Sequence, residues 1–347
     1  MKRMIWLVAA LVAVPAAAQE VERVPSRVAA VYNLAGHVEV VRGSGPDVVV
    51  YIDRGGADAA ELRVEVGEIR GRETLRIVYP DDEVVYPELG RGSNTSLSVR
   101  NDGTFSDSGR GGRSDRVHIR GRGDGLEAWA DLTIEVPAGG EIEVYLAAGQ
   151  VTADGVEGDV SIDTGSGEVT ARDIHGSLAV DTGSGSVEVR GIAGGDVIVD
   201  TGSGRVEISD VRARDIEVDT GSGGVKGYGL EGDLVNVDTG SGSIELESVT
   251  APDVILDTGS GSIEIGLMAD IDRLEADTGS GSVTVHAPAD LGAEVEIETG
   301  SGGIDLDFPV EVRTARRDHV IGTIGDGRGQ ITIDTGSGSV RLVQSRN

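Results

Sequence analysis

The chain has 347 residues, a formal net charge of −30, no cysteine and 3% aromatic residues, and 54 of its residues are glycine. A surface this acidic repels nucleic acid and anionic lipid, so neither is an expected partner. Without cysteine the chain can have no disulfide framework and no lipid-carrying cysteine, and the low aromatic content argues against a conventional bulky core.

The first 18 residues have the features of a secretory signal peptide. Lys2 and Arg3 form the charged start, Ile5 to Val14 is a short apolar run, and Ala16-Ala17-Ala18 suits cleavage. No later run is long and apolar enough to span a bilayer. We therefore expect an exported protein without a membrane span, periplasmic or extracellular, that begins at Gln19 after cleavage.

Residues 19–140 predict an irregular β region that caps the rest of the chain. Val28 to Ile52 has the pattern strand, turn, strand, with the turn at Gly43-Ser44-Gly45-Pro46, and it resembles one irregular coil of a solenoid. Apolar and polar residues alternate from Leu62 to Val66 and from Leu75 to Tyr79, which indicates two half-buried strands.

Residues 91–125 are rich in Gly, Ser, Asn and Asp, which favours a flexible loop around one short strand, Val117 to Ile119. The segment also carries a series of arginines: Arg100, Arg110, Arg113, Arg116, Arg120 and Arg122. Because the rest of the chain is acidic, this Arg-rich segment is a candidate site for an anionic ligand.

From residue 141 onward one motif, Asp-Thr-Gly-Ser-Gly, organises the chain. It begins at Asp163, Asp181, Asp200, Asp219, Asp238, Asp257, Asp277 and Asp334, with a Glu-headed copy at Glu298. Most copies are about 19 residues apart, and such a period predicts one solenoid coil per repeat. The longer step from Glu298 to Asp334 leaves room for one further copy of the motif with a diverged sequence.

Each repeat predicts two short strands. One follows the motif, as at Val206/Ile208, and the other leads into it, as at Val197/Val199. A period of two puts each aliphatic pair on one face of its strand, and the repeat stacks it over the equivalent pair of the next coil. Residues 141–347 therefore predict an all-β fold, a single-stranded parallel β-helix with an aliphatic interior, whose last coil caps the open end of the sheet.

Several features together resemble a known family. They are the signal peptide, Asn33-Leu34-Ala35-Gly36, Pro137-Ala138-Gly139, the Asp-Thr-Gly-Ser-Gly array and the terminal Gly-Thr-Ile-Gly-Asp-Gly. On these residues the chain resembles the bacterial putative-adhesin family of β-strand-repeat proteins, a domain of unknown function, over nearly all of the mature chain. The resemblance implies a parallel β-helix in the cell envelope, and it brings no catalytic residues.

An apolar residue before Asp-Thr-Gly-Ser is also the signature of an aspartic protease, which needs two carboxylates that share one proton in a cleft. Nine copies at a coil period are better explained by turn geometry, in which Asp and Thr side chains bind backbone N–H groups and the glycines adopt positive φ. The five histidines are scattered, and we interpret them as surface or turn residues.

The stacked motif carboxylates are the candidate metal site. At the roughly 4.8 Å spacing of strands, neighbouring carboxylates repel by about 0.9 kcal/mol in water. Hydrogen bonds from the Thr and Ser hydroxyls would offset this repulsion, and so would a row of cations such as calcium; we favour the hydrogen bonds. The candidate cation ladder is Asp163, Asp181, Asp200, Asp219, Asp238, Asp257 and Asp277.

We therefore predict a non-enzymatic, exported β-solenoid without a cofactor, an adhesin-like binding or structural module of the cell envelope whose partner is a surface polymer or protein. The alternatives are a carbohydrate-active β-helix enzyme, either a polysaccharide lyase or a glycosidase, and a calcium-binding repeat protein. A locally irregular cleft with converging Asp, Arg and Tyr side chains would favour the enzyme, whereas a uniform outer face would favour the binding module.

Overall fold

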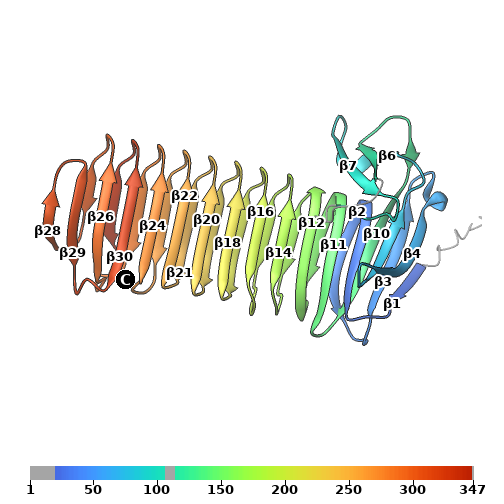
Figure 1. Ribbon diagram of the computed structural model, residues 1–347, viewed down its shortest axis with the longest axis horizontal. Coiled ribbons are helices and arrows are strands. Elements are labelled where there is room, and N and C mark those ends of the chain that lie inside the picture. The colour runs from blue at the N-terminus through green and yellow to red at the C-terminus, as the bar shows by residue number, and fades with distance from the viewer. Residues whose placement is uncertain (1–19, 106–113, 346–347) are drawn as a thin grey trace, which may run out of the picture.

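The computed structural model describes residues 20–105 and 114–345. The predicted signal peptide and two arginines of the Arg-rich segment, Arg110 and Arg113, lie outside these residues. The described chain is an elongated stack of strands (Figure 1). Within it the helical elements are two short 3-10 turns, η1 (Ala59–Glu61) and η2 (Pro87–Leu89).

The repeats form two rows of strands. The strands that lead into each motif form the first row: β12 (Gly158–Ser166), β14 (Leu178–Thr182), β16 (Val197–Thr201), β18 (Asp215–Thr220), β20 (Leu234–Thr239), β22 (Asp253–Thr258) and β24 (Arg273–Thr278). The strands that follow each motif form the second row: β13 (Val169–Arg172), β15 (Val187–Arg190), β17 (Val206–Arg212), β19 (Val225–Glu231), β21 (Ile244–Thr250), β23 (Ile263–Leu267) and β25 (Val283–Ala287). Neighbours within a row are parallel. The predicted all-β parallel β-helix is confirmed.

The two rows enclose a column of aliphatic side chains. In one coil Val197, Val206 and Ile208 are at most 2% exposed, whereas the neighbouring Ile198 is 45% exposed and Glu207 also points outward. Each buried side chain of this kind contributes about 1.5–3 kcal/mol. Because the same positions repeat in every coil, the core grows with the stack and needs no aromatic residues.

The stack begins before the first motif, at β2 (Val28–Gly43), which is parallel to β11 (Gly140–Asp154) along most of its length. The irregular coil expected near Val28 is therefore present, and residues 44–139 are an insertion between two stacked coils. The insertion extends the stack with β10 (Trp129–Pro137) and β3 (Val48–Gly55), and with the hairpin β4 (Arg63–Ile69) and β5 (Arg72–Val78). Strand β1 (Glu20–Val24), which precedes β2, pairs with β3. A domain boundary at residue 140 remains a prediction.

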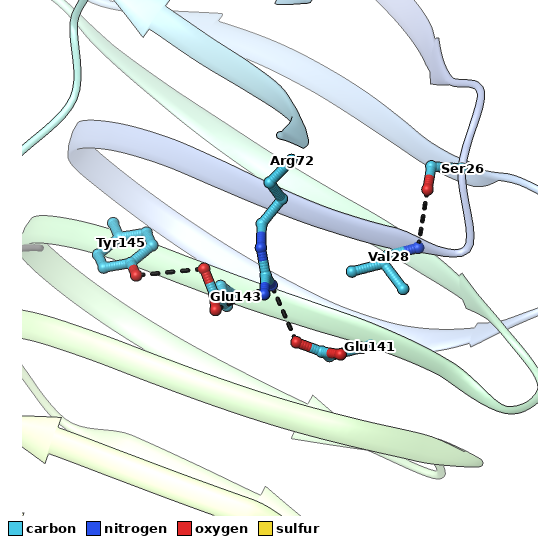
Figure 2. A network of polar contacts seen from close by, with 6 residues as sticks. All are labelled: Ser26, Val28, Arg72, Glu141, Glu143 and Tyr145. Carbon is cyan, nitrogen blue, oxygen red and sulfur yellow. Dashed lines mark hydrogen bonds and ion pairs between the residues drawn. The ribbon is translucent and has the colours of Figure 1, made fainter. Parts of the chain in front are cut away.

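Ion pairs join the insertion to the first coils. Arg72, at the start of β5, lies 2.9 Å from Glu141 and 2.8 Å from Glu143 on β11. Figure 2 shows this contact and the hydroxyl of Tyr145, which donates to Glu143 at 3.2 Å. These ion pairs hold the hairpin of β4 and β5 to β11.

A four-stranded sheet lies against the outside of the first coils. Its order is β7 (Asn94–Arg100), β8 (Ser114–Arg120), β6 (Glu83–Val85) and β9 (Leu126–Glu127). We call it, together with η2, the side sheet. Where the sequence predicted a loop around one short strand, the structure pairs β7 with β8. The reason is burial: Phe105, after β7, is 2% exposed and packs edge-on to Tyr32 of β2 at 5.6 Å.

The C-terminal end departs from the predicted order of coils. The coil of Asp334, formed by β30 (Gly329–Thr335) and β31 (Val340–Gln344), lies between the coil of Asp277 and that of Glu298, formed by β26 (Ala293–Thr299) and β27 (Ile304–Leu306). Figure 1 shows β30 between β24 and β26. The last coil is therefore an inner coil, and the prediction that it caps the stack was wrong.

The segment between Glu298 and Asp334 contains a hairpin instead of a disguised motif copy. Its strands are β28 (Val310–Ala315) and β29 (His319–Ile324), and β29 is antiparallel to β26. The hairpin ends the first row. The coil order was not predictable from the period, because every coil offers its neighbours the same aliphatic pairs.

Candidate functional site

The motif carboxylates form one row along a corner of the stack. Strand register aligns Asp163, Asp181, Asp200, Asp219, Asp238, Asp257, Asp277, Asp334 and Glu298 in this spatial order. From Asp181 onward these residues are exposed. The predicted alignment is confirmed, whereas cation binding stays a prediction. Toward the N-terminal end Tyr145 and Tyr32 continue the row, and their rings stack 4.3 Å apart.

Repulsion within the carboxylate row alters its acidity. The pKa of Asp200 is raised above its ordinary value, first by partial burial and then by the charges of Asp181 and Asp219. The same causes raise the pKa of Asp238 and of Asp277. Burial and a nearby like charge both disfavour the ionised form. The row is therefore a source of instability at neutral pH.

The motif threonines bind the backbone and not the carboxylates. Thr239 is fully buried; its Oγ1 accepts the N–H of Gly242 at 3.0 Å and donates to the carbonyl of Gly223 in the preceding coil at 2.8 Å. The same two bonds recur at Thr220, Thr258, Thr278, Thr299 and Thr335. The expectation that these hydroxyls offset the carboxylate repulsion was therefore wrong for these copies, because each hydroxyl already joins two coils.

The motif glycines are required by close contact in most copies. A Cβ atom on Gly242 would lie 1.9 Å from the carbonyl oxygen of Gly223. Positive φ occurs at the last glycine of the first two copies, Gly167 (150°) and Gly185 (155°), so the predicted positive φ is correct for those two. There the corner differs, and the buried Oγ1 atoms of Thr164 and Thr182 have no hydrogen-bond partner among the described residues.

A groove that the sequence did not predict lies where the side sheet meets the corners of the first coils. It has a volume of 580 Å³. Glu88 and Asn94 line it from the side sheet, and Gln150, Ser166 and Ser184 line it from the solenoid. We call this hollow the corner groove.

A second hollow of 380 Å³, lined by Asp53 and Asp131, shares His37 and Gln150 with the corner groove. In the part of the chain that the structure describes, no Lys or Arg side chain lines either hollow. The two hollows together are therefore an acidic, hydrogen-bonding surface without a fixed positive charge.

His37 joins the two walls of the corner groove. Its backbone N–H donates to Asp131 Oδ1 at 2.8 Å, and its ring Nε2 lies 2.5 Å from Glu88 Oε2. Tyr86 also donates its hydroxyl to Glu88, at 3.2 Å. The contact with His37 lowers the pKa of Glu88, while burial, with the nearby charges of Glu88 and Asp53 adding to it, raises the pKa of Asp131.

The sequence offered one signal for this site: His37 follows Gly36 at a corner equivalent to Gly149-Gln150. Its partner Glu88 is 51 residues away in an insertion, so no local pattern connects them. The earlier interpretation of His37 as a surface or turn residue missed the contact.

Arginines of the Arg-rich segment make contacts within the side sheet. Arg120 lies 2.9 Å from Glu83, Arg116 donates to Ser96 at 3.1 Å, and Arg100 donates to Thr104 at 3.1 Å. The pair of Arg120 with Glu83 offsets one positive charge, whereas the hydrogen bonds of Arg116 and Arg100 to hydroxyl groups orient these side chains without neutralising them.

Across residues 20–105 and 114–345, no group of three or more His, Cys, Asp or Glu side chains is placed to hold a metal ion. Over the same residues no helix has the length and hydrophobicity needed to cross a membrane.

Comparison with known proteins gives one matching family model and two matching solved structures. The family model described as Toastrack DUF4097 matches residues 130–343. No curated protein sequence matches the chain. A putative cell adhesion protein from Clostridium sporogenes ATCC 15579 is 10% identical, with a TM-score of 0.20 and coverage of 94% of this chain and 99% of that chain. A putative adhesin from Bacteroides fragilis NCTC 9343 is 12% identical, with a TM-score of 0.37 and coverage of 95% and 99%.

Proposed function

Since this chain belongs to the Toastrack DUF4097 family, we propose that it is an exported, non-enzymatic binding module of the cell envelope whose partner is a repetitive surface polymer. The signal peptide predicted at residues 1–18 supports export to the periplasm or the cell surface. The adhesin-like names of the two related structures agree with a role in surface binding.

The observation that carries this proposal is the repeated corner. The same motif places the same side chains at one edge of successive coils, each about 4.8 Å from the next. Such an array offers many equivalent weak contacts, and these add up to useful avidity only for a partner that also repeats. Catalysis would instead require one preorganised set of groups, which a uniform row does not provide.

The negative charge of the solenoid limits which class of polymer can be its partner. Between residues 141 and 313 there are 36 Asp and Glu residues against 8 Lys and Arg residues. A polyanion would be repelled by this surface at physiological salt. The favoured partner is therefore an uncharged or cationic polymer.

A carbohydrate-active enzyme is the second candidate, and the corner groove together with the adjoining second hollow is the observation that favours it. Glu88 and Asp131 flank His37, and their pKa values are shifted in opposite directions, as in an acid–base pair. Glu88 is already bound by His37 and Tyr86, however, which suits a structural role. Depolymerisation of an uncharged polysaccharide by the purified protein, lost on Glu88→Gln, would establish the enzyme.

The binding function can be tested by retention of native envelope material on the immobilised mature chain. We expect a polymer to be retained, and we expect Ser222→Trp, Ser241→Trp and Ser260→Trp together to reduce its retention, because these exposed serines lie along the repeated corner. The matched control is Arg212→Trp, Glu231→Trp and Thr250→Trp. These exposed residues form one row at the opposite end of their strands, and the three changes leave the net charge unaltered. Equal loss in both variants, or no retention by the parent chain, would contradict the proposal.

A further inference from the structure

The corner groove combines features of a ligand site that the repeated corner lacks. Its two walls come from parts of the chain far apart in sequence, and its volume of 580 Å³ falls within the roughly 300–1,000 Å³ typical of ligand sites. His37 and Glu88 connect the walls at 2.5 Å, and His37 also lines the adjoining second hollow.

The corner groove is lined by the carboxylates of Glu88 and Glu168 and otherwise mainly by neutral polar side chains. Because Glu88 is already bound by His37 and Tyr86, the neutral groups favour an uncharged ligand with many hydroxyl groups. Ser93, Asn94, Gln150, Ser166 and Ser184 supply neutral hydrogen-bond donors and acceptors. A phosphate, sulfate or carboxylate would find no Lys or Arg in the described lining to balance its charge. An apolar peptide side chain would need an apolar pocket, but among the described lining residues Leu89 and the ring of Tyr86 are the large apolar groups.

One lining group lacks a partner. The Oγ atom of Ser166 is buried and makes no hydrogen bond within the described residues. A buried hydroxyl left unsatisfied costs about 1–3 kcal/mol, and rotation of the Ser166 side chain toward the groove would let a ligand hydroxyl supply the missing bond.

The corner groove is continuous with the repeated corner. Ser184 lines the groove, and the equivalent serines of the next coils, Ser203 and Ser222, are exposed beyond it. Figure 1 shows β6 and β7 of the side sheet rising above the loops at this edge, at one end of the stack. A linear polymer that lies along the serines would therefore meet the side sheet at the groove.

We propose that the corner groove binds the terminal segment of an uncharged glycan whose remaining length lies along the repeated corner. This inference rests on the proposed function as a polymer-binding module, and it assigns the site and the ligand class. The groove supplies a specific contact at one chain end, while the repeated corner adds the weaker contacts.

The test measures binding of short glycans to the mature chain by calorimetry. The probes are the uncharged maltotriose, cellotriose and triacetylchitotriose, with trigalacturonate as the anionic probe and deacetylated chitotriose as the cationic probe. We expect at least one uncharged trisaccharide to bind, and to bind more tightly than both charged probes.

Two tryptophan variants locate the binding site. Ser184→Trp, which fills the groove, should weaken binding at least tenfold, a loss of about 1.4 kcal/mol. The matched Ser260→Trp lies at the equivalent corner four coils away, about 19 Å at the spacing of strands, and should change the affinity less than twofold. On the opposite wall, Asn94→Ala should weaken binding about three- to tenfold through one lost hydrogen bond. If Ser184→Trp does not fold, the Asn94→Ala variant shows whether the ligand binds in the corner groove.

Three results would overturn the site: no binding of any uncharged trisaccharide, tighter binding of a charged probe, or equal weakening by Ser184→Trp and Ser260→Trp. The failure of the site is distinguishable from that of the proposed function. Envelope polymer that is retained by the parent and equally by Ser184→Trp contradicts the site alone, whereas absence of any retained polymer contradicts the function.

Discussion

At the scale of single residues, the threonine and the glycines of the motif join each coil to the next. The threonine Oγ1 takes the place of a backbone partner for a glycine N–H and a glycine carbonyl, which would otherwise be left unpaired at a buried corner. The glycines allow the carbonyl of the preceding coil to approach the Cα atom closely.

Thr239→Val tests the threonine bonds. The substitution keeps the shape but leaves the N–H of Gly242 and the carbonyl of Gly223 without this partner, so we expect a loss of about 1–3 kcal/mol in the free energy of unfolding. Thr182→Val is the matched control, because the Oγ1 of Thr182 is buried without a partner; it should be neutral or stabilising. Urea denaturation followed by circular dichroism measures both, and equal losses would argue against a special role for the bonds.

Gly240→Val tests the close approach between coils. A Cβ atom at this position would lie 2.4 Å from the carbonyl oxygen of Gly221, and overpacking of this kind costs about 1–3 kcal/mol. The loss was expected from positive φ, but the contact now explains it, since Gly240 is not among the residues with positive φ. Gly303→Val is the control, because a Cβ atom there meets no atom within 4 Å. A stable Gly240→Val variant would show that the coils can separate at this corner.

At the scale of elements, the side sheet depends on the solenoid for its core. Tyr32, Ala147 and Ala148 of the first coils pack with Val117 and Phe105 of the insertion in one apolar cluster. Phe105 is 2% exposed, so part of the segment that the sequence predicted as a flexible loop belongs to this core. Removal of the Phe105 side chain would uncover Tyr32.

Phe105→Ala should unfold the side sheet while the later coils remain folded. Loss of a buried phenylalanine costs about 3–5 kcal/mol, and Phe105 lies in the apolar cluster that joins the side sheet to Tyr32. Trp129 packs against Tyr86 of the side sheet at 5.9 Å, so its fluorescence reports on this region, whereas far-ultraviolet circular dichroism reports mainly on the coils. The control is Val312→Ala, at a residue that is 52% exposed. A single transition seen by both probes would show that the two parts unfold together.

At the scale of the whole molecule, the carboxylate row links stability to pH. The pKa values of Asp200, Asp238 and Asp277 are raised in the folded state. The folded chain therefore binds protons at these carboxylates more tightly than the unfolded chain does. Their penalty is absent below the ordinary Asp pKa of about 3.9 and grows as pH rises through the folded values. The row therefore destabilises the solenoid most at neutral pH.

Replacing these three residues by asparagine should raise the melting temperature at pH 7. The difference from the parent should shrink as pH falls toward 4, because the parent carboxylates then become protonated. Comparing the variant with the parent cancels the contributions of unchanged groups such as Glu88. The pKa of Glu88 is lowered, so its contribution to stability is lost in acid. A gap that stays constant with pH would mean that the row is not under electrostatic strain.

Calcium provides an independent test of the same row. We expect calcium to shift the melting temperature no more than magnesium at equal ionic strength. The ladder carboxylates from Asp181 onward are exposed, and dissolved cations of either kind screen such a dense negative charge in the same way. A large calcium-specific shift that disappears in Asp219→Asn with Asp238→Asn would instead make this a calcium-dependent solenoid.

The sequence by itself determined the repeating unit. Pairs such as Val206/Ile208 are buried, and Asp200 and Asp219 are aligned, because the strand period of two and the repeat of about 19 residues are properties of the local chain that every coil obeys. Only the tertiary structure decided the position of the coil of Asp334, because all coils present equivalent surfaces and their order is not encoded locally. It also decided the contact of His37 with Glu88, since that contact depends on how a long insertion folds back across the first coils.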